Sequence, residues 1–221
     1  MTISLLAFDV NSGTFGGAAT TGSLCVGGWV LRGDVRSGLS ASQGSSPSTL
    51  WGEDALSLMG TGLSARDTVA RLTKDDPGRS HRQLSVLDGT GGTASFTGAD
   101  SIAYAGALDA DCLVVSGNML VSAKVLTAAR DGYREGHGPM AVRLLSGLRA
   151  AAAAGGDLRG LKSAALLQLH ADHAPLSLRI DYAENPLEAM QALYDRATSQ
   201  PYVSWTEVVP TRNDPYRSKT A

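Results

Sequence analysis

The stretch that decides the fold is MTISLLAFDV, residues 1–10. The polar turn Asn11-Ser12-Gly13 follows it, and a second run of strand-forming residues extends from Phe15 to Thr21. Two such runs joined by a short Gly-containing turn predict a β-hairpin. Chain ends are usually loose unless something ties them down. Here the chain end is itself the first strand, so the sheet is expected to hold the residue at position 2.

That residue is Thr2, and its place in the chain suggests a chemistry. A threonine is small enough for the initiator Met1 to be removed, which leaves Thr2 with a free α-amino group. The hydroxyl can then act as a nucleophile, and the amine, whose pKa is about 8, can accept its proton. The same residue is equally compatible with an ordinary strand position after an initiator Met. If Met1 stays, its peptide bond occupies the amine and this mechanism fails.

Length and composition exclude several classes of function. The chain has 221 residues, 43 % of them hydrophobic and 18 % charged, with a net charge of −2. This size predicts one domain or two small ones. Without a basic stripe or a long apolar run, we expect neither a nucleic-acid partner nor a membrane partner. Cys25 and Cys112 lie in apolar, strand-like surroundings, so we expect buried free thiols and a cytoplasmic protein.

The order of the expected elements favours an α+β fold. Strand-like runs are interrupted by pairs of helices, and the strands come as antiparallel hairpins rather than as single strands between helices. This order argues against a doubly wound parallel sheet and for two stacked sheets with helices outside. The expected helices span about residues 49–60, 64–75, 122–135, 139–154 and 186–197, whereas 23–31 and 82–88 read as strands and 97–111 as a loop.

The domain is expected to end near residue 199. Residues 200–221 contain three prolines and mixed polar residues, which predicts an extended C-terminal arm. Tyr202, Trp205, Val208 and Val209 are apolar for a segment in free solvent. We therefore expect the arm to dock on the domain or on a neighbouring subunit, and the protein to be a homo-oligomer.

Four segments together resemble one family. They are the first hairpin with its continuation to Gly27, the stretch from Arg82 to Gly98, residues 117–120, and AGGDLRGLKSAAL at 154–166. They resemble the domain-of-unknown-function 1028 family, which is placed with the N-terminal-nucleophile hydrolases. The resemblance covers about residues 2–195. It implies a four-layer αββα sandwich, Thr2 as the nucleophile and an amide-type bond as the substrate, while the family itself offers no known substrate.

Several other residues are candidates for catalysis. Asn118 lies at the exit of a strand and precedes a helix. Its side-chain amide, or the backbone N–H groups at the start of that helix, are candidates for stabilising an oxyanion. An Asn that only caps the helix or forms a turn is an equally good interpretation. Asp157 and Arg159, in a Gly-rich turn, are candidates for an ion pair that orients the amine or clamps a carboxylate, or for a structural salt bridge. Ser163 opens a strand and is a candidate to bond the α-amine or simply to pack.

The candidates for substrate binding are Ser40, Ser42 and Gln43, at the end of an early strand. No cofactor is expected, because no phosphate-binding Gly-rich motif is present. No metal site is expected either. His170, Asp172 and His173 are the closest group of potential ligands, and they lie in a predicted hairpin loop, where such residues are usually solvated.

Three hypotheses for function remain open. The first is hydrolysis of an amide bond in a small molecule or short peptide by Thr2. The second is a non-catalytic binding or scaffold protein on the same fold with Met1 retained. Departures from the family pattern at Ser116, at residues 20–23 and after Gln43 favour this second hypothesis. The third is another class of enzyme, with Asp157 as an acid or base.

Overall fold

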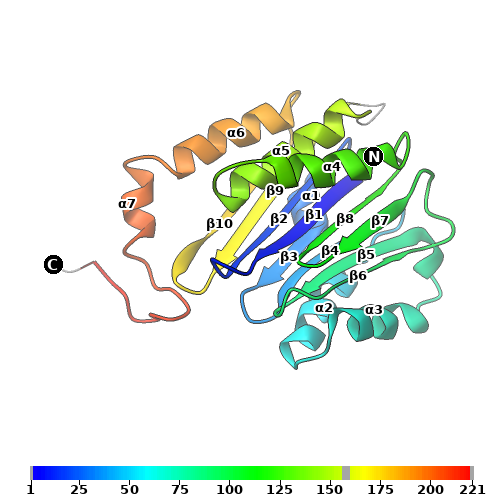
Figure 1. The fold of residues 1–221 in the computed structure, drawn as a ribbon, viewed down its shortest axis with the longest axis horizontal. Helices are drawn as coiled ribbons and strands as arrows, with labels where there is room; N and C mark the ends of the chain where they lie inside the picture. Colours follow the sequence, from blue (N-terminus) through cyan, green and yellow to red (C-terminus); the bar gives the residue numbers. More distant parts are fainter. Residues whose placement is uncertain (1, 156–159, 220–221) are drawn as a thin grey trace.

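Two antiparallel sheets stack face to face (Figure 1). The structure is a computed structural model and describes residues 2–155 and 160–219. The first sheet has six strands in the order β10-β9-β2-β1-β8-β7, and the second has four in the order β3-β4-β5-β6. Their bounds are β1 Thr2–Asp9, β2 Thr14–Thr21, β3 Leu31–Asp34, β4 Gly38–Gly44, β5 Arg82–Asp88, β6 Thr93–Thr97, β7 Gly106–Ala110, β8 Leu113–Asn118, β9 Ser163–His170 and β10 His173–Ile180.

Helices cover the outer face of each sheet (Figure 1). The described residues form seven α-helices: α1 Val26–Trp29, α2 Thr49–Gly60, α3 Ala65–Lys74, α4 Lys124–Glu135, α5 Met140–Ala153, α6 Pro186–Ala197 and α7 Tyr202–Thr206. The α4/α5 pair and α6 pack on the six-stranded sheet, while α2 and α3 pack on the four-stranded sheet. The fold is therefore α+β, as the order of elements predicted. No helix in the described ranges combines the length and apolarity that a membrane span requires.

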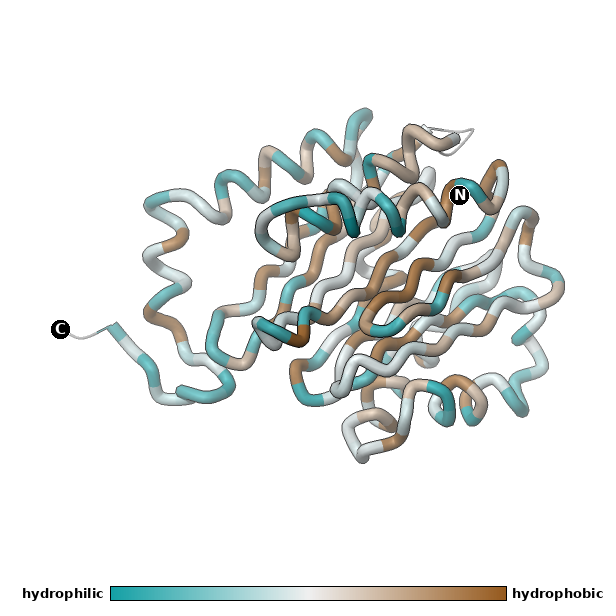
Figure 2. Tube along the Cα trace, viewed as in Figure 1, coloured by the Kyte–Doolittle hydropathy of each residue, from teal (hydrophilic) through white to brown (hydrophobic). Residues whose placement is uncertain are grey.

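The alternation of side chains along β1 shows how the layers are held. Ile3, Leu5 and Ala7 face the helices and belong to the core under α4 and α5. Leu6 faces the second sheet and belongs to the core between the sheets. Because successive side chains of a strand point to opposite faces, one strand serves both cores. Figure 2 shows the hydrophobic residues concentrated along these central strands.

The space between the sheets also contains buried hydroxyl groups. Ser4 and Ser116 lie with their hydroxyl oxygens 3.0 Å apart, and the hydroxyl of Ser85, from the opposite sheet, donates to Ser116 at 2.6 Å. These groups are fully buried and satisfy one another. Ser116 thus links the two sheets.

Two local predictions were wrong. The segment at 23–31 is not a continuous strand, because Cys25 has φ 59° and precedes the short helix α1. The segment at 97–111 is not all loop, because Gly106–Ala110 forms the edge strand β7 and pairs with β8. In the second segment it is pairing with β8 that makes so short a run a strand.

The cysteines are free thiols, but neither lies within a strand. Cys25 caps α1, and Cys112, with φ 60°, lies in the turn between β7 and β8. Both are only partly buried. Burial nevertheless raises the pKa of the Cys112 thiol above its ordinary value, and nearby Asp111 adds to that effect.

The C-terminal arm is not fully extended, because it contains the short helix α7. After this helix the arm returns to the β9–β10 turn, where the side chain of Asn213 donates to Asp172 at 2.7 Å. The backbone N–H of Asn213 also donates to the carbonyl of Ala171 at 3.0 Å. The arm therefore docks on its own domain, while Trp205 and Tyr216 stay exposed.

Candidate functional site

Polar side chains gather at one end of the space between the sheets. Thr2 starts β1, and it lies directly opposite Thr21 on β2 and Asn118 on β8. Gln43 and Gln83 are paired in register on β4 and β5 of the other sheet. The neighbouring part of this layer is filled with aliphatic and aromatic side chains. A polar cluster at the end of an apolar layer is a typical place for a binding or catalytic site.

Thr2 is held by both neighbouring strands, and its hydroxyl is directed into this cluster. The hydroxyl oxygens of Thr2 and Thr21 are 3.0 Å apart, which is hydrogen-bonding distance. The Thr21 oxygen also accepts from the backbone N–H of Ser23 at 3.3 Å. These contacts fix the rotamer of Thr2, so the prediction that the sheet holds position 2 is confirmed.

Gln83 organises the opposite wall. This residue is fully buried, and its side-chain nitrogen donates to the carbonyl oxygens of Gly106 and Gly117, both at 3.0 Å. Its side-chain oxygen accepts from Gln43 at 2.6 Å and from Asn118 at 3.4 Å. A single buried amide therefore sets the positions of two other amides beside Thr2.

A pocket of about 300 Å³ opens at this cluster. Its polar wall includes Thr2, Thr21 and Gln43. The rest of its lining is mainly apolar, and the described residues there are Ser23, Leu24, Val26, Trp29, Val30, Gly44 and Pro47. This volume is at the lower end of the range for small-molecule sites. Leu24 and Trp29 are more than half exposed, which leaves apolar surface at the rim.

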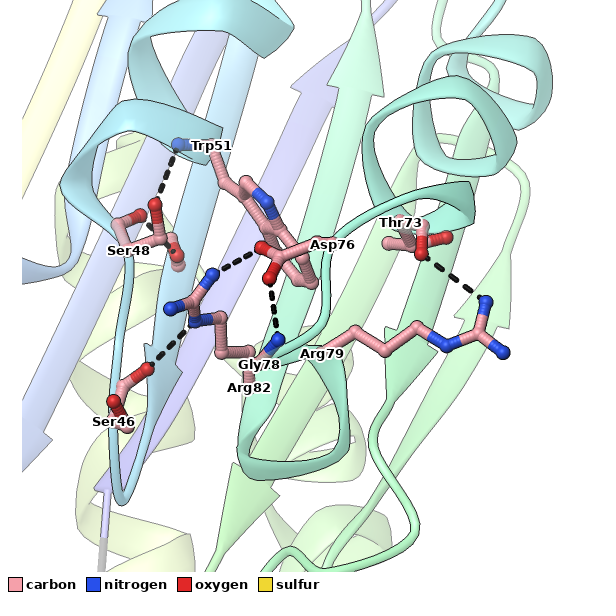
Figure 3. Close-up of polar contacts among 9 residues, drawn as sticks. Ser46, Ser48, Trp51, Thr73, Asp76, Gly78, Arg79 and Arg82 are labelled. Carbon is pink, nitrogen blue, oxygen red and sulfur yellow. Dashed lines mark hydrogen bonds and ion pairs between the residues drawn. The ribbon is translucent and has the colours of Figure 1, made fainter.

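Residues 44–48, called the pocket loop here, form one edge of the pocket and are anchored from β5 (Figure 3). The guanidinium of Arg82 pairs with Asp76 and donates to the carbonyl of Ser46 at 3.1 Å. The hydroxyl of Ser48 accepts from the N–H of Trp51 at 3.3 Å and so caps α2. Charge-assisted pairing and a helix cap together fix this edge of the pocket.

Ser163 lies beside the cluster but is engaged with the backbone. Its hydroxyl donates to the carbonyl of Ser23 at 2.8 Å and accepts from the N–H of Val26 at 3.1 Å. The residue is fully buried and lies opposite Thr21 in the β2–β9 register. Its hydroxyl proton is therefore already used, and Ser163 holds the segment from Ser23 to Val26 against the pocket.

The expectation that Ser40 and Ser42 line the site is wrong. The hydroxyl of Ser40 donates to the carbonyl of Gly52 at 2.8 Å, and that of Ser42 donates to the carbonyl of Ser48 at 2.7 Å. Both serines thus point toward α2, on the opposite face of β4 from Gln43. The reason is the two-residue period of a strand, which separates neighbouring side chains to opposite faces.

The helix after Asn118 begins close to residue 122, where it was expected, and is too far along the chain for its first N–H groups to follow Asn118 directly. The helix α4 begins at Lys124, and the residue after Asn118, Met119, has φ 56°. The N–H of Met119 donates to the carbonyl of Ile102, and the N–H of Leu120 donates to that of Tyr104. These backbone groups are therefore occupied, and the side-chain amide of Asn118, which lies opposite Thr2 in the β1–β8 register, is the remaining candidate donor from this segment.

Three residues of the proposed chemistry, Met1, Asp157 and Arg159, lie outside the described residues. The segment that follows residues 156–159 does approach the site. The N–H of Lys162 donates to the carbonyl of Thr21 at 2.8 Å, which joins this part of the chain to the end of β2.

The histidine group lies at the β9–β10 turn, apart from the pocket. The ring of His170 accepts from the N–H of Asp172 at 3.0 Å, and its other nitrogen is 2.8 Å from the carbonyl oxygen of Ser12. Both ring nitrogens are thus engaged with the backbone. Within the described ranges no group of three or more potential ligands is close enough to hold a metal ion.

Gln83, Thr21 and Trp29 are site residues that the sequence did not single out. Gln83 and Ser85 are polar residues at alternate positions of a strand whose other face is apolar, which is the available signal of a polar layer. That signal does not tell which end of the strand meets Thr2. The position of Trp29 in the pocket wall was not predicted, because its segment was expected to be a strand.

Comparison with known proteins places the chain in a family. Residues 2–190 match the family described as "Family of unknown function (DUF1028)". The chain belongs to this family. The DUF1028 match begins at Thr2 and includes every described residue that lines the pocket, whereas the C-terminal arm lies beyond it.

A solved structure of the same family has the same fold. The crystal structure of protein SPO2555 from Silicibacter pomeroyi, a DUF1028 protein, is 44 % identical in sequence, with a TM-score of 0.95. The similarity covers 99 % of this chain and 99 % of that chain. No curated protein has significant similarity to the chain.

Proposed function

We propose that this DUF1028 protein hydrolyses an amide bond in a small molecule or short peptide, with Thr2 as an N-terminal nucleophile after removal of Met1. The observation that carries the proposal is the position of the Thr2 hydroxyl. It lies at the start of a central strand, on the wall of a pocket of about 300 Å³ and 3.0 Å from a second hydroxyl. The proposal also assigns the two stacked sheets and their outer helices to the four-layer αββα architecture of the N-terminal-nucleophile hydrolases.

The proposed reaction proceeds in two steps. The hydroxyl oxygen of Thr2 attacks the substrate carbonyl while the α-amine of the same residue takes the hydroxyl proton. The C–N bond then breaks, and the leaving amine takes that proton and departs. Water hydrolyses the ester that remains on Thr2, which restores the hydroxyl and releases the carboxylic acid.

The neighbouring side chains suit these steps. The hydroxyl of Thr21 holds the Thr2 hydroxyl at hydrogen-bonding distance. Among the described residues, the side-chain nitrogen of Asn118 has a hydrogen-bond contact only with Gln83, at 3.4 Å. This distance is at the long end of the hydrogen-bonding range, so the nitrogen gains by bonding a developing oxyanion. The pocket volume favours a small acyl or amine group over a long chain.

The test separates the hydroxyl from the amine. The intact mass of the purified protein is expected to show the loss of Met1. On a panel of small amides, Thr2→Ala is expected to lower kcat/KM at least about a thousandfold. A protein with one extra Gly before Thr2 keeps the hydroxyl but blocks the amine, and it is expected to be equally inactive.

Thr14→Ala is the matched control, because Thr14 lies at the opposite end of the same hairpin and its hydroxyl accepts from Ser12. This variant is expected to keep full activity. Unchanged turnover in Thr2→Ala, or full activity with Met1 still attached, overturns the proposal.

A further inference from the structure

The amide of Gln43 presents an acceptor without a partner at the candidate site. Gln43 is 1 % exposed, and its side-chain oxygen has no hydrogen-bond partner in the described part of the chain. Buried acceptors in folded proteins are nearly always paired, because an unpaired one loses its bonds to water without replacement. Gln43 is among the residues that line the pocket, so its unpaired acceptor indicates a donor supplied by a ligand bound there.

The orientation of this amide follows from its neighbour. The carbonyl oxygens of Gly106 and Gly117 can only accept, so the end of Gln83 that faces them must be its nitrogen. The oxygen of Gln83 consequently faces Gln43, at 2.6 Å. An oxygen there requires a donor, so Gln43 must turn its nitrogen to Gln83.

The other end of the Gln43 amide is thereby an oxygen. Asn118 supports this assignment, because its side-chain nitrogen approaches the same oxygen of Gln83. Turning Gln43 over would place two acceptor oxygens 2.6 Å apart in a buried site. The chain of contacts that starts at two backbone carbonyls therefore fixes the polarity of the pocket wall.

We infer that Gln43 is the residue that selects the substrate, by accepting a hydrogen bond from a neutral N–H group of a small amide. This inference rests on the proposed function and names the substrate class of the same pocket: amides with an N–H, as opposed to esters. The apolar walls formed by Val26, Val30 and Pro47 suit an uncharged group next to that N–H. A site that offers a buried acceptor discriminates against analogues that lack the donor.

The test measures binding, so that it does not depend on turnover. The probes are three isosteric pairs, the N-methyl amides and the methyl esters of acetic, isovaleric and benzoic acid, which differ in each pair by N–H against O. They are titrated into the Thr2→Ala protein, and binding is followed by tryptophan fluorescence. Trp29 lines the pocket, so Trp29→Phe is the control for the location of the signal.

At least one amide is expected to bind about tenfold more tightly than its ester. Gln43→Met has nearly the same length but no acceptor, and it is expected to remove that preference while the ester affinity stays within about twofold. A circular dichroism spectrum checks the fold of this variant. If Gln43→Met does not fold, the inference is still tested by the comparison of amide with ester affinity in the Thr2→Ala protein.

Equal affinities within all three pairs, no binding of any probe, or a preference that persists in a folded Gln43→Met protein overturns the inference. These outcomes are distinct from failure of the proposed function. An amide preference in a protein whose hydrolysis is insensitive to Thr2 rejects the nucleophile alone. Thr2-dependent hydrolysis without an amide preference rejects the role of Gln43 alone.

Discussion

Gln83→Met tests the polar network most directly, because methionine keeps the length of the side chain and removes both of its polar ends. The nitrogen of Gln83 donates to two backbone carbonyls and to the hydroxyl of Thr97, and its oxygen accepts from Gln43 and Asn118. Gln83 is completely buried, with 0 % of its surface accessible to solvent. The substitution therefore leaves several buried groups without a partner.

The size of the expected loss of stability follows from the number of buried groups whose hydrogen-bond partner is Gln83. Each buried group that loses its partner costs about 1–3 kcal/mol. Counting only the amide of Gln43 and the carbonyl of Gly117, the expected loss is about 2–6 kcal/mol. The cavity contribution is small, because the two side chains are of similar size. A domain with a typical stability of about 5–15 kcal/mol would remain folded in most of this range.

The assay is equilibrium unfolding in urea, followed by circular dichroism. With a slope of about 3 kcal/mol per M, this loss moves the midpoint down by about 0.7–2 M. Gln191→Met is the matched control, because Gln191 lies on α6 and its amide bonds Arg149 and Asp195 at the surface. Its expected effect is below about 0.5 kcal/mol.

The same network predicts that Gln83 also affects which ligand the pocket prefers, through the orientation of the Gln43 amide. Without the oxygen of Gln83, nothing forces the nitrogen of Gln43 toward β5, so its amide is free to turn over. Gln83→Met is therefore expected to reduce the preference for amides although Gln43 is still present. A loss of stability below 1 kcal/mol, or an unchanged preference in a folded variant, would refute the reasoning that Gln83 sets the polarity of the pocket.

Three further predictions concern the scaffold. Burial raises the pKa of Asp88, but four hydrogen bonds lower it more, so the net pKa is below its ordinary value. The charged carboxylate therefore stabilises the fold above pH about 4, and this stabilisation is lost as the pH falls below that value. In urea titrations, the loss of stability caused by Asp88→Asn is expected to shrink as the pH falls below about 4. Gly38→Ala is expected to lower the free energy of unfolding by about 2–4 kcal/mol in the same assay, and by more than Gly62→Ala does. Both glycines have a positive φ, but of the two only Gly38 lacks room for a Cβ. Equal losses in the two variants contradict this reasoning. Arg82→Met is expected to speed amide hydrogen exchange in the pocket loop. Arg79→Met is expected to leave it unchanged, because the guanidinium of Arg79 bonds carbonyls near the end of α3. Equal exchange in the two variants argues against Arg82 as an anchor of the loop.

Much of the fold could be read from local patterns. The hairpin from residue 2 to residue 21 follows from two strand-forming runs around a polar turn. The helix at 64–75 was expected, and it begins at Ala65, after Ser64, whose hydroxyl accepts from the N–H of Asp67. The helix at Pro186 likewise begins at a proline in its first turn. These features depend on residues close in sequence, so the sequence alone specifies them.

The site was predictable only in part. Thr2, Asn118 and Gln43 were expected from their positions at the ends of strands, and the structure brings them together. Ser40 and Ser42 were misassigned, because the face to which a strand residue points depends on the packing of the sheet and not on its position in the chain. Whether Asp157 and Arg159 join the site stays a prediction.

The sequence by itself determined most of the elements, the apolar alternation that makes two cores, and a threonine held at the first position of a strand. Only the tertiary structure decided which end of the second sheet lies over that threonine. It also decided that the glutamine at position 83 contacts two carbonyls of the first sheet and thereby orients the glutamine at position 43. The physical reason is that hydrogen-bond polarity is set by pairing across the two sheets, between residues far apart in the chain, and no local pattern records such pairing.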